Sequence, residues 1–217
     1  MPLRLVGIAS RSPDRRSSTY LEKVAVVYPR EMQQVQAEID RHIGSERLPT
    51  LADLPQLPYT QAFICECSRL SPISPFGLHR AVSQEDEYMG YRIPADATIL
   101  PFLWGMNMDE TIHPNPTFFQ PQRWIDNPTL SSPDAFGFGK RLCPGKPIAE
   151  RMIFITIACV AWGYDFTAAD GFEYQADKYN LFSTPSTSAI RVLCRSPAHR
   201  ATIERVHREA DLRSEGI

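Results

Sequence analysis

A cysteine at position 143 stands in a glycine-rich turn, directly ahead of a segment whose apolar residues are typical of a buried helix. Gly137 and Gly139 precede the cysteine and allow a tight turn of the backbone, and Gly145 lets a flat ligand come close to the main chain. The dipole and free N–H groups at a helix N-terminus favour a thiolate over a thiol. A thiolate is a soft metal ligand and a nucleophile, so we expect Cys143 to carry the chemistry.

A second pair of charged residues lies earlier in the chain. Glu66 and Arg69 stand three residues apart in a segment that runs without a helix breaker from Tyr59 to Leu70. In a helix this spacing puts the carboxylate and the guanidinium on one face, where they can form an ion pair. Taken alone, such a pair is ordinary and equally typical of a solvated surface.

The other cysteines do not suggest a disulfide framework or a zinc site. The chain has 5 cysteines, an odd number in a sequence that is long enough to form a hydrophobic core. Cys65 and Cys67 are separated by one residue, and no second pair stands at zinc-site spacing. Cys159 and Cys194 lie in apolar surroundings that favour a packing role. We therefore expect a reducing compartment.

Composition and charge exclude several classes of protein. The 217 residues include 23 Lys and Arg against 25 Asp and Glu, a net charge of −2 that argues against a nucleic-acid partner. Hydrophobic residues make up 43% and charged residues 22%, as in ordinary globular proteins. The longest apolar run, Met152 to Trp162, is much shorter than the roughly 20 residues of a membrane span. With no anchor or signal peptide in view, we expect this chain to be cytoplasmic.

Periodicity and breakers predict the elements that position these residues. Apolar residues at Met32, Val35, Ile39 and Ile43 have helical spacing, and Gly44 ends that segment. The full set of expected helices covers residues 20–27, 31–43, 59–70, 104–108 and 146–162. Short apolar segments over 78–101 predict a small antiparallel sheet, and prolines predict an irregular, ordered meander over 113–124. Residues 1–19 read as an irregular lead-in and 196–217 as an exposed, charged, amphipathic tail.

The cysteine turn resembles the heme-binding signature of the cytochrome P-450 superfamily. That signature is Phe-x-x-Gly-x-Arg-x-Cys-x-Gly, and Phe136, Gly139, Arg141, Cys143 and Gly145 match each of its fixed positions. The resemblance implies that Cys143 is the axial ligand of the heme iron. It also implies that the glycine turn, with Gly137, forms part of the cofactor-binding loop.

Two further motifs of the family occur in the expected order. Glu66 and Arg69 match the Glu-x-x-Arg of the family's helix K, and residues 119–124 resemble its Pro-x-Arg-Phe/Trp meander motif. In the family these residues interlock, so the resemblance implies a buried charge triad of Glu66, Arg69 and Arg123. The role of this triad would be to hold the thiolate loop in place.

The resemblance covers about residues 20–195 and is closest to fungal or microsomal members. It implies a mainly α fold with a small β component (α+β), namely the C-terminal heme-binding half of the P-450 fold, from the end of helix I through helices J, K and L. It further implies heme b as cofactor and the insertion of one oxygen atom from O2 into a small lipophilic substrate. Electrons would come from NADPH through a flavoprotein reductase, and Lys140 and Lys146 either contact that partner or are merely solvated.

Basic residues would bind the heme propionates. Arg141 matches the motif for this role, and Arg80 resembles the basic residue after helix K, with the neighbouring His79 as the weaker choice. Residues 73–78 and 181–185 resemble segments of the substrate pocket.

The sequence departs from the family in its first residues. The family's oxygen-activation motif, with its glycine and threonine, is expected near residues 9–14, where neither residue occurs and Pro13 would break a helix. No distal catalytic residue is therefore assigned. Family members are considerably longer and are typically anchored in the endoplasmic reticulum. Three hypotheses follow: a heme-thiolate monooxygenase or its heme-binding half, a catalytically inactive heme-binding or partner-interaction remnant, and an unfolded product of a truncated gene.

Overall fold

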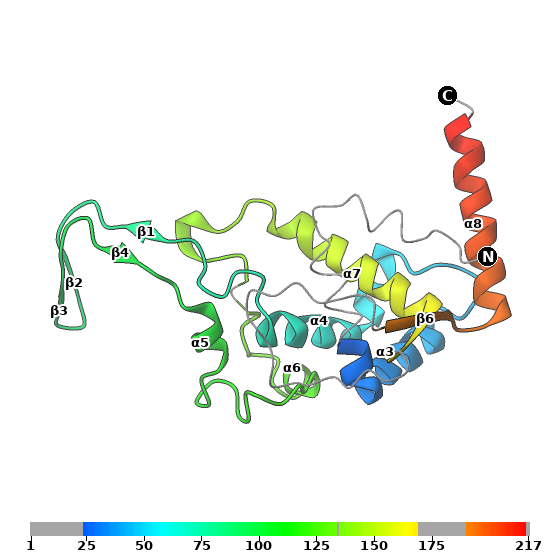
Figure 1. Ribbon diagram of the computed structural model, residues 1–217, viewed down its shortest axis with the longest axis horizontal. Coiled ribbons are helices and arrows are strands. Elements are labelled where there is room, and N and C mark those ends of the chain that lie inside the picture. The colour runs from blue at the N-terminus through cyan, green and yellow to red at the C-terminus, as the bar shows by residue number, and fades with distance from the viewer. Residues whose placement is uncertain (1–23, 134, 169–189, 216–217) are drawn as a thin grey trace.

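The computed structural model describes residues 24–133, 135–168 and 190–215 of the chain. The described residues form a mainly helical fold with small antiparallel sheets (Figure 1), as the sequence predicts. Three sequence predictions lie outside them in whole or in part: the lead-in 1–19 with the motif position 9–14, the first residues of the helix over 20–27, and the pocket segment 181–185.

Helices and short strands follow one another along the chain. The helices are α3 (Pro29–His42), η1 (Leu51–Gln56), α4 (Pro58–Leu70), α5 (Leu103–Asn107), α6 (Gln122–Asp126), η2 (Gly139–Arg141), α7 (Lys146–Gly163) and α8 (Pro197–Glu215). Residues 24–27 are also helical. Both α3 and α4 begin at a proline, one or two residues earlier than predicted. Proline suits the first turn of a helix because its fixed φ is already helical and its missing N–H would have no partner there.

The core lies where α3, α4 and α7 meet. Val35 and Ile39 from α3, Phe63 from α4, and Phe154 and Trp162 from α7 belong to one buried apolar cluster. Burying side chains of this size stabilises the fold by roughly 1.5–3 kcal/mol each. The three-helix cluster therefore forms the platform from which α4 and α7 present the candidate site.

A buried carboxylate connects two of these helices. Glu38 of α3 accepts the backbone N–H groups of Tyr59 and Thr60, at 2.7 and 2.8 Å, and the hydroxyl of Thr60 at 2.7 Å. These N–H groups belong to the first turn of α4, where a helix has donors without internal partners. Glu38 thus caps α4 from a neighbouring helix and fixes the angle at which α4 leaves the core.

Three two-stranded antiparallel sheets complete the described part. They pair β1 (Arg80–Ala81) with β4 (Thr98–Ile99), β2 (Asp86–Tyr88) with β3 (Tyr91–Ile93), and β5 (Tyr164–Ala168) with β6 (Ile190–Cys194). The first two sheets lie within the predicted range 78–101 and extend away from the helices, at the end of the molecule opposite α8 (Figure 1).

The meander differs from its prediction at its end. Prolines were expected to prevent regular structure through Trp124, but Gln122–Asp126 form the helix α6. The prediction was wrong here because Pro121 stands directly ahead of the helix, where its ring does not interrupt helical hydrogen bonds. Arg123 and Trp124 are consequently presented from a helical turn.

The charged residues after 196 form the helix α8. Its first turns are docked on the core: His199 and Thr202 are buried, and the hydroxyl of Thr202 donates to the carbonyl oxygen of Ser45 at 2.9 Å. Farther along the helix, Leu212 is exposed. Within the described ranges, no helix has the length and apolar character needed to cross a bilayer.

Candidate thiolate site

Cys143 lies in a tight loop shaped by two glycines. Gly137 and Gly139 have φ values of +76° and +63°, which L side chains rarely adopt. The backbone N–H of Cys143 donates to the carbonyl oxygen of Phe136 at 3.0 Å, and that of Leu142 donates to Gly139 at 3.1 Å. The loop is therefore closed on itself by main-chain hydrogen bonds, and both glycines expected to permit such a turn are used.

The loop leads directly into α7. Gly145 is the N-cap of this helix, and the carbonyl oxygen of Cys143 accepts the N–H of Lys146 at 3.2 Å. A Cβ atom at position 145 would lie 3.6 Å from the Cys143 Sγ. The absence of a side chain at Gly145 therefore leaves open the space beside the sulfur, and Cys143 is two residues ahead of the N-cap.

Exposure distinguishes Cys143 from the other cysteines. All five cysteines are described and free, and Cys143 alone among them is exposed. Burial raises the pKa of Cys65 and of Cys159 to about 11, and it raises the pKa of Cys67 well above the usual range. Only Cys143 thus combines access to a ligand with a position ahead of a helix.

The structure brings Glu66, Arg69 and Arg123 into one buried cluster. Glu66 and Arg69 are 0% exposed, and Arg69 forms two hydrogen bonds to the carboxylate, Nε to Oε2 at 2.9 Å and Nη2 to Oε1 at 2.8 Å. Arg123 reaches the same carboxylate from α6, with Nε 3.2 Å from Oε1. A buried charge requires such partners, because an isolated one is strongly unfavourable.

The two guanidinium groups also bind main-chain carbonyl groups, at the end of α5 and in the meander. Arg69 donates through Nη1 to the carbonyl oxygen of Asn107 at 2.9 Å, and the side-chain amide of Asn107 donates back to the carbonyl of Arg69 at 3.0 Å. Arg123 donates through Nη1 to the carbonyl oxygen of Pro114 at 2.9 Å. The cluster therefore fixes α4, the end of α5 and the meander relative to one another.

Further contacts of Glu66 were missed by the sequence reasoning. The indole N–H of Trp124 donates to Oε2 at 2.9 Å, and the backbone N–H of Gln120 donates to Oε1 at 2.9 Å. His113 is buried against Trp124 with ring centroids 5.8 Å apart, and burial together with Arg69 lowers the pKa of His113. Trp124 directly follows Arg123 in the sequence, which was the one available indication that both residues reach Glu66. The sequence analysis did not predict α6, the helix that directs both side chains to this carboxylate.

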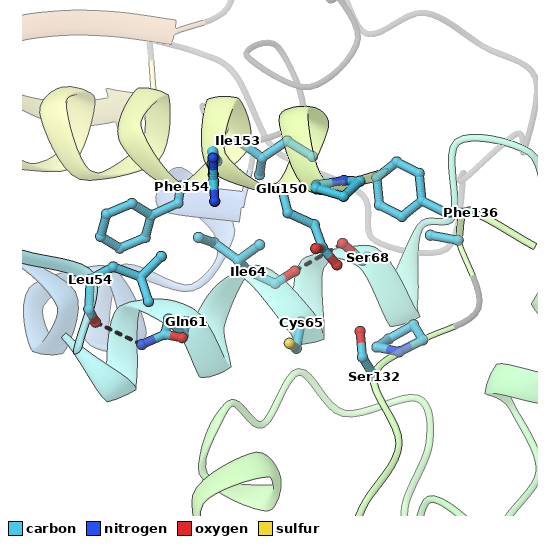
Figure 2. A pocket seen from close by; sticks show the side chains of 14 residues that line it. Leu54, Gln61, Ile64, Cys65, Ser68, Ser132, Phe136, Glu150, Ile153 and Phe154 are labelled. Carbon is cyan, nitrogen blue, oxygen red and sulfur yellow. Dashed lines mark hydrogen bonds between the residues drawn. The ribbon is translucent and has the colours of Figure 1, made fainter. Parts of the chain in front are cut away.

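A cavity of about 460 Å³ lies beside Phe136, at the start of the Cys143 loop, which comprises residues 136–143 (Figure 2). Its lining comes from α4 (Cys65 and Ser68), from α7 (Glu150 and Phe154) and from the Cys143 loop (Phe136). Figure 2 shows the Phe136 ring beside the start of α7, with the segment around Ser132 on the opposite wall. The beginning of the loop is thus separated from α4 by open space over part of its length.

The basic residues expected at the propionates are exposed. Arg80 begins β1 and Arg141 ends η2, and neither has an ion pair with any residue that the structure describes. His79, the weaker choice, is exposed as well. Lys140 is exposed, whereas Lys146 forms an ion pair in which its Nζ lies 3.7 Å from Oε1 of Glu150. Both arginines are therefore available to an anionic ligand.

The first segment expected in the pocket wall is partly open to solvent. Ile73 and Leu78 are exposed apolar side chains at its two ends, and Gly77 between them has a φ of +54°. On α7, Ile148 and Met152 form an exposed apolar stripe one helical turn apart, 66% and 51% exposed. Apolar surface of this kind can cover a lipophilic ligand or another part of a protein.

Comparison with known proteins identifies the family. The family model "Cytochrome P450" matches residues 26–187. The chain belongs to the cytochrome P450 family. The matched range includes the Cys143 loop, α4 with Glu66, and α6 with Arg123.

Similar proteins are fungal cytochrome P450 monooxygenases. FrzL of Cladobotryum sp. is 41% identical over 198 residues, which are 88% of this chain and 38% of that protein. The aneD monooxygenase of Aspergillus aculeatus is 35% identical over 96% of this chain and 43% of its own length, and fumitremorgin C synthase of Neosartorya fischeri is 38% identical over 82% and 35%. A solved structure of a zebra fish cytochrome P450 with abiraterone aligns at a TM-score of 0.67 and 27% identity, covering 72% of this chain and 37% of that one. The chain thus spans well under half the length of these relatives.

The P450 family implies heme, and the donor set suits it. No cluster of three or more His, Cys, Asp or Glu residues suitable for a bare metal ion occurs among the described residues. Heme iron can be held by a single cysteine thiolate from the protein, and Cys143 offers one exposed sulfur. Arg80 and Arg141, which lack ion pairs among the described residues, suit the carboxylates of such a cofactor.

Proposed function

We propose that this chain is the carboxyl-terminal, heme-binding part of a heme-thiolate monooxygenase that inserts one oxygen atom of O2 into a lipophilic organic substrate. Cys143 carries this proposal, because it is the single exposed cysteine and stands in a glycine-shaped loop ahead of α7. Family membership and the fungal monooxygenases that resemble the chain support the reaction class.

Each residue of the loop has a defined task in this proposal. Cys143 would supply the thiolate ligand of the heme iron, and Phe136, whose carbonyl oxygen accepts the Cys143 N–H, closes the loop around the cysteine. Gly137 and Gly139 adopt the positive φ values that the turn requires, and Gly145 keeps the flank of the sulfur free. Arg141 and Arg80 bind the propionates of heme b through charge-assisted hydrogen bonds.

The protein's share of the chemistry is ligation and positioning. Bound heme would supply O2 activation, a chemistry that a thiolate ligand from the protein favours. Glu66, Arg69 and Arg123 act at a distance from that chemistry: they bind α4, α5 and the meander together and so fix where the chain enters the loop. We include no acid or base on the distal side, because the motif position 9–14 contains neither the glycine nor the threonine.

Substrate and electron donor follow from the surface and from the family. The exposed apolar side chains of Ile73 and Leu78 suit a small lipophilic substrate. Electrons come from NADPH through a flavoprotein reductase, which docks near the exposed Lys140 beside the loop. Lys146 contributes less to this surface because Glu150 lies 3.7 Å from it.

A second candidate function is a catalytically inactive heme-binding or partner-interaction remnant. The exposed apolar stripe of Ile148 and Met152 on α7 favours it, because such a stripe is normally covered by packing. The aligned part of the chain corresponds to 38% of the FrzL length. In this case the chain binds heme or another polypeptide but inserts no oxygen.

One experiment separates the two candidates. The purified chain is reconstituted with heme, reduced under carbon monoxide, and its absorption spectrum is recorded before turnover assays with a flavoprotein reductase. A strongly red-shifted Soret band together with NADPH-dependent product formation supports the monooxygenase. The same band without turnover supports the remnant, and the absence of the band overturns thiolate ligation in both.

A further inference from the structure

The aromatic ring of Phe102 lies against the segment that follows α4. It is stacked on the ring of Phe76, with the centroids 5.4 Å apart and the planes inclined by 12°. We infer that Phe102 is a specificity-determining residue, whose ring forms with that of Phe76 a wall for a flat, uncharged aromatic molecule. The inference rests on the proposed function only in calling that molecule a substrate, because the wall itself is made by contacts within the described chain.

The surface around this ring pair is apolar and partly open. Phe102 is 43% exposed although it stacks on Phe76, which is half-buried. Ile73 and Leu78, at the two ends of the same segment, are 58% and 72% exposed. None of these side chains is charged. An ionic group bound here would lose its hydration without gaining a partner from them, so the surface suits an uncharged lipophilic molecule.

Main-chain hydrogen bonds fix the segment that carries Phe76. The N–H of Gly77 donates to the carbonyl oxygen of Ser74 at 3.0 Å, and the hydroxyl of Ser74 donates to the carbonyl oxygen of Gly77 at 3.2 Å. The N–H of Trp104 donates to the carbonyl oxygen of Pro75 at 3.1 Å. Trp104 lies in the first turn of α5, whose N-cap is Phe102. The two stacked rings therefore belong to backbones that are bonded to each other.

Gly105 provides the space that the Phe102 ring occupies. A Cβ atom at position 105 would lie 2.5 Å from Cδ1 and 2.6 Å from Cε1 of Phe102. The φ of Gly105 is not positive, and glycine is unfavourable within a helix, so the backbone of α5 gives no reason for a glycine at this position. The Trp104 ring lies beside the Phe102 ring as well, with centroids 5.9 Å apart. The orientation of Phe102 is thus set by its neighbours before any ligand binds.

A fixed aromatic wall distinguishes aromatic from saturated molecules. Aromatic rings carry a negative face and a positive edge, so a further ring can bind to a ring pair in an offset or edge-to-face arrangement. This contact adds to the burial of apolar area, whereas a saturated molecule gains from the burial alone. A flexible chain in addition loses rotational freedom when it binds to a fixed surface. A flat, rigid ring system is therefore the ligand that this wall favours.

Matched probes and variants separate the aromatic contact from apolar area. Naphthalene and decalin are uncharged and share one carbon skeleton, but only naphthalene is aromatic. Phe102→Leu removes the ring and keeps an apolar side chain, whereas Phe102→Tyr keeps a ring. Gly105→Ala leaves Phe102 in the sequence and puts a methyl group into the space of its ring. Tyr88→Leu is the control, because it removes an exposed aromatic side chain from β2, outside this wall.

The first measurement is the dissociation constant of each probe for the heme-free chain, by titration followed with NMR. We expect the wild type to bind naphthalene more tightly than decalin. Phe102→Leu and Gly105→Ala should each weaken naphthalene binding about three- to tenfold and decalin binding about twofold or less, since only naphthalene loses an aromatic contact. Phe102→Tyr and Tyr88→Leu should retain the affinity for naphthalene. Loss of local packing alone would weaken both probes equally, and that result in Phe102→Leu overturns the inference, as does an equal loss of naphthalene affinity in Phe102→Tyr.

The wild-type protein provides a test that does not depend on the folding of any variant. Nuclear Overhauser effects should connect the protons of bound naphthalene with the ring protons of Phe102 and Phe76. Contacts of naphthalene with other residues only, or no binding of naphthalene, overturn the inference.

The heme-loaded chain tests whether the wall belongs to the substrate site. We expect naphthalene to perturb the Soret band of the wild type, and Phe102→Leu to raise the concentration of half-maximal change by the same factor as in the heme-free chain. Naphthalene that contacts Phe102 without changing the band overturns the assignment to a substrate site. If the wild-type chain gives no thiolate band under carbon monoxide, the proposed function fails, whereas the probe affinities and the Overhauser contacts still decide whether Phe102 selects aromatic ligands.

Discussion

The backbone N–H of Cys143 donates to the carbonyl oxygen of Phe136 at 3.0 Å and closes the glycine turn between them. The bond makes the position of the sulfur depend on the main chain, not on packing of the cysteine side chain, which is exposed. A substitution that preserves the backbone should therefore leave the loop intact and change only the ligand atom.

Cys143→Ser should accordingly abolish thiolate ligation without unfolding the chain. A serine hydroxyl replaces the sulfur, and the loop keeps both its main-chain hydrogen bond and its glycines. The measurement is the absorption spectrum of the heme-loaded, reduced protein under carbon monoxide, alongside a thermal melt. Cys159→Ser is the matched control, because Cys159 is half-buried with its pKa raised to about 11 by burial. A thiolate-type band that persists in Cys143→Ser would rule out this ligand.

Glu66→Gln should destabilise the fold strongly. The amide has nearly the shape of the carboxylate, but Arg69 and Arg123 would remain buried without their counter-charge. Breaking one partner of a buried pair costs about 3–5 kcal/mol, which is a large part of the stability of a domain. Urea unfolding monitored by circular dichroism measures the loss.

The control for Glu66→Gln is Glu85→Gln. Glu85 pairs with Arg92 on the surface, where solvent screens the interaction, so its replacement should not shift the unfolding midpoint measurably. Equal midpoints for wild type and Glu66→Gln would contradict a structural role for the buried cluster.

The helices α3 and α4 were predictable from the sequence, whereas their first residues were not. Met32, Val35 and Ile39 are buried along α3 as their helical spacing predicts. The ranges 31–43 and 59–70 expected for these helices leave out Pro29 and Pro58. Each of these prolines begins its helix, because proline disrupts only the helix interior. A breaker rule applied without regard to position thus shortens helices at their N-termini.

Only some of the contacts of Glu66 could be predicted from the sequence. Its spacing from Arg69 predicts a shared helix face, and the helix α4 provides one. The link to Arg123 was implied by resemblance to a family and not by spacing, because the two residues are 57 positions apart. The donor from Trp124 belongs to α6, which the proline pattern did not predict, and the donor from Gln120 lies two residues ahead of that helix. Long-range side-chain geometry of this kind requires the fold.

Gly77→Ala should destabilise the turn after α4. Gly77 has a φ of +54°, and a Cβ there would lie 2.5 Å from Pro101 Cγ, closer than real Cβ contacts allow. Backbone strain and the collision with a rigid ring together should cost about 1–3 kcal/mol. Thermal unfolding provides the measurement.

Gly90→Ala separates the two causes of that loss. Gly90 has a φ of +81° but no atom within 4 Å of the added Cβ, so this variant carries the backbone strain without the collision. It should destabilise the protein less than Gly77→Ala. An equal loss in both variants would show that the contact with Pro101 contributes nothing.

Docking of α8 should weaken as the pH falls. His199 is buried with its ring edge-on to that of Trp162, the ring centroids being 4.7 Å apart. Its Nδ1 is hydrogen-bonded to the Ser196 hydroxyl, and its Nε2 has no hydrogen-bond partner among the residues that the structure describes. Burial lowers the pKa of His199, and Arg195 lowers it further, while Asp40 opposes the shift. The neutral ring is therefore the form that fits the docked helix.

The sign of this pH dependence follows from the lowered pKa. The unfolded chain takes up its proton near pH 6.5 and the folded chain only at lower pH, so stability is complete above about pH 6.5 and falls as the pH drops toward the folded pKa. Urea unfolding between about pH 7.5 and about pH 5.5 measures the slope. Because burial also lowers the pKa of His113, His199→Gln should reduce the slope and addition of His113→Gln should reduce it further. An undiminished slope in His199→Gln would show that α8 docks independently of this ring.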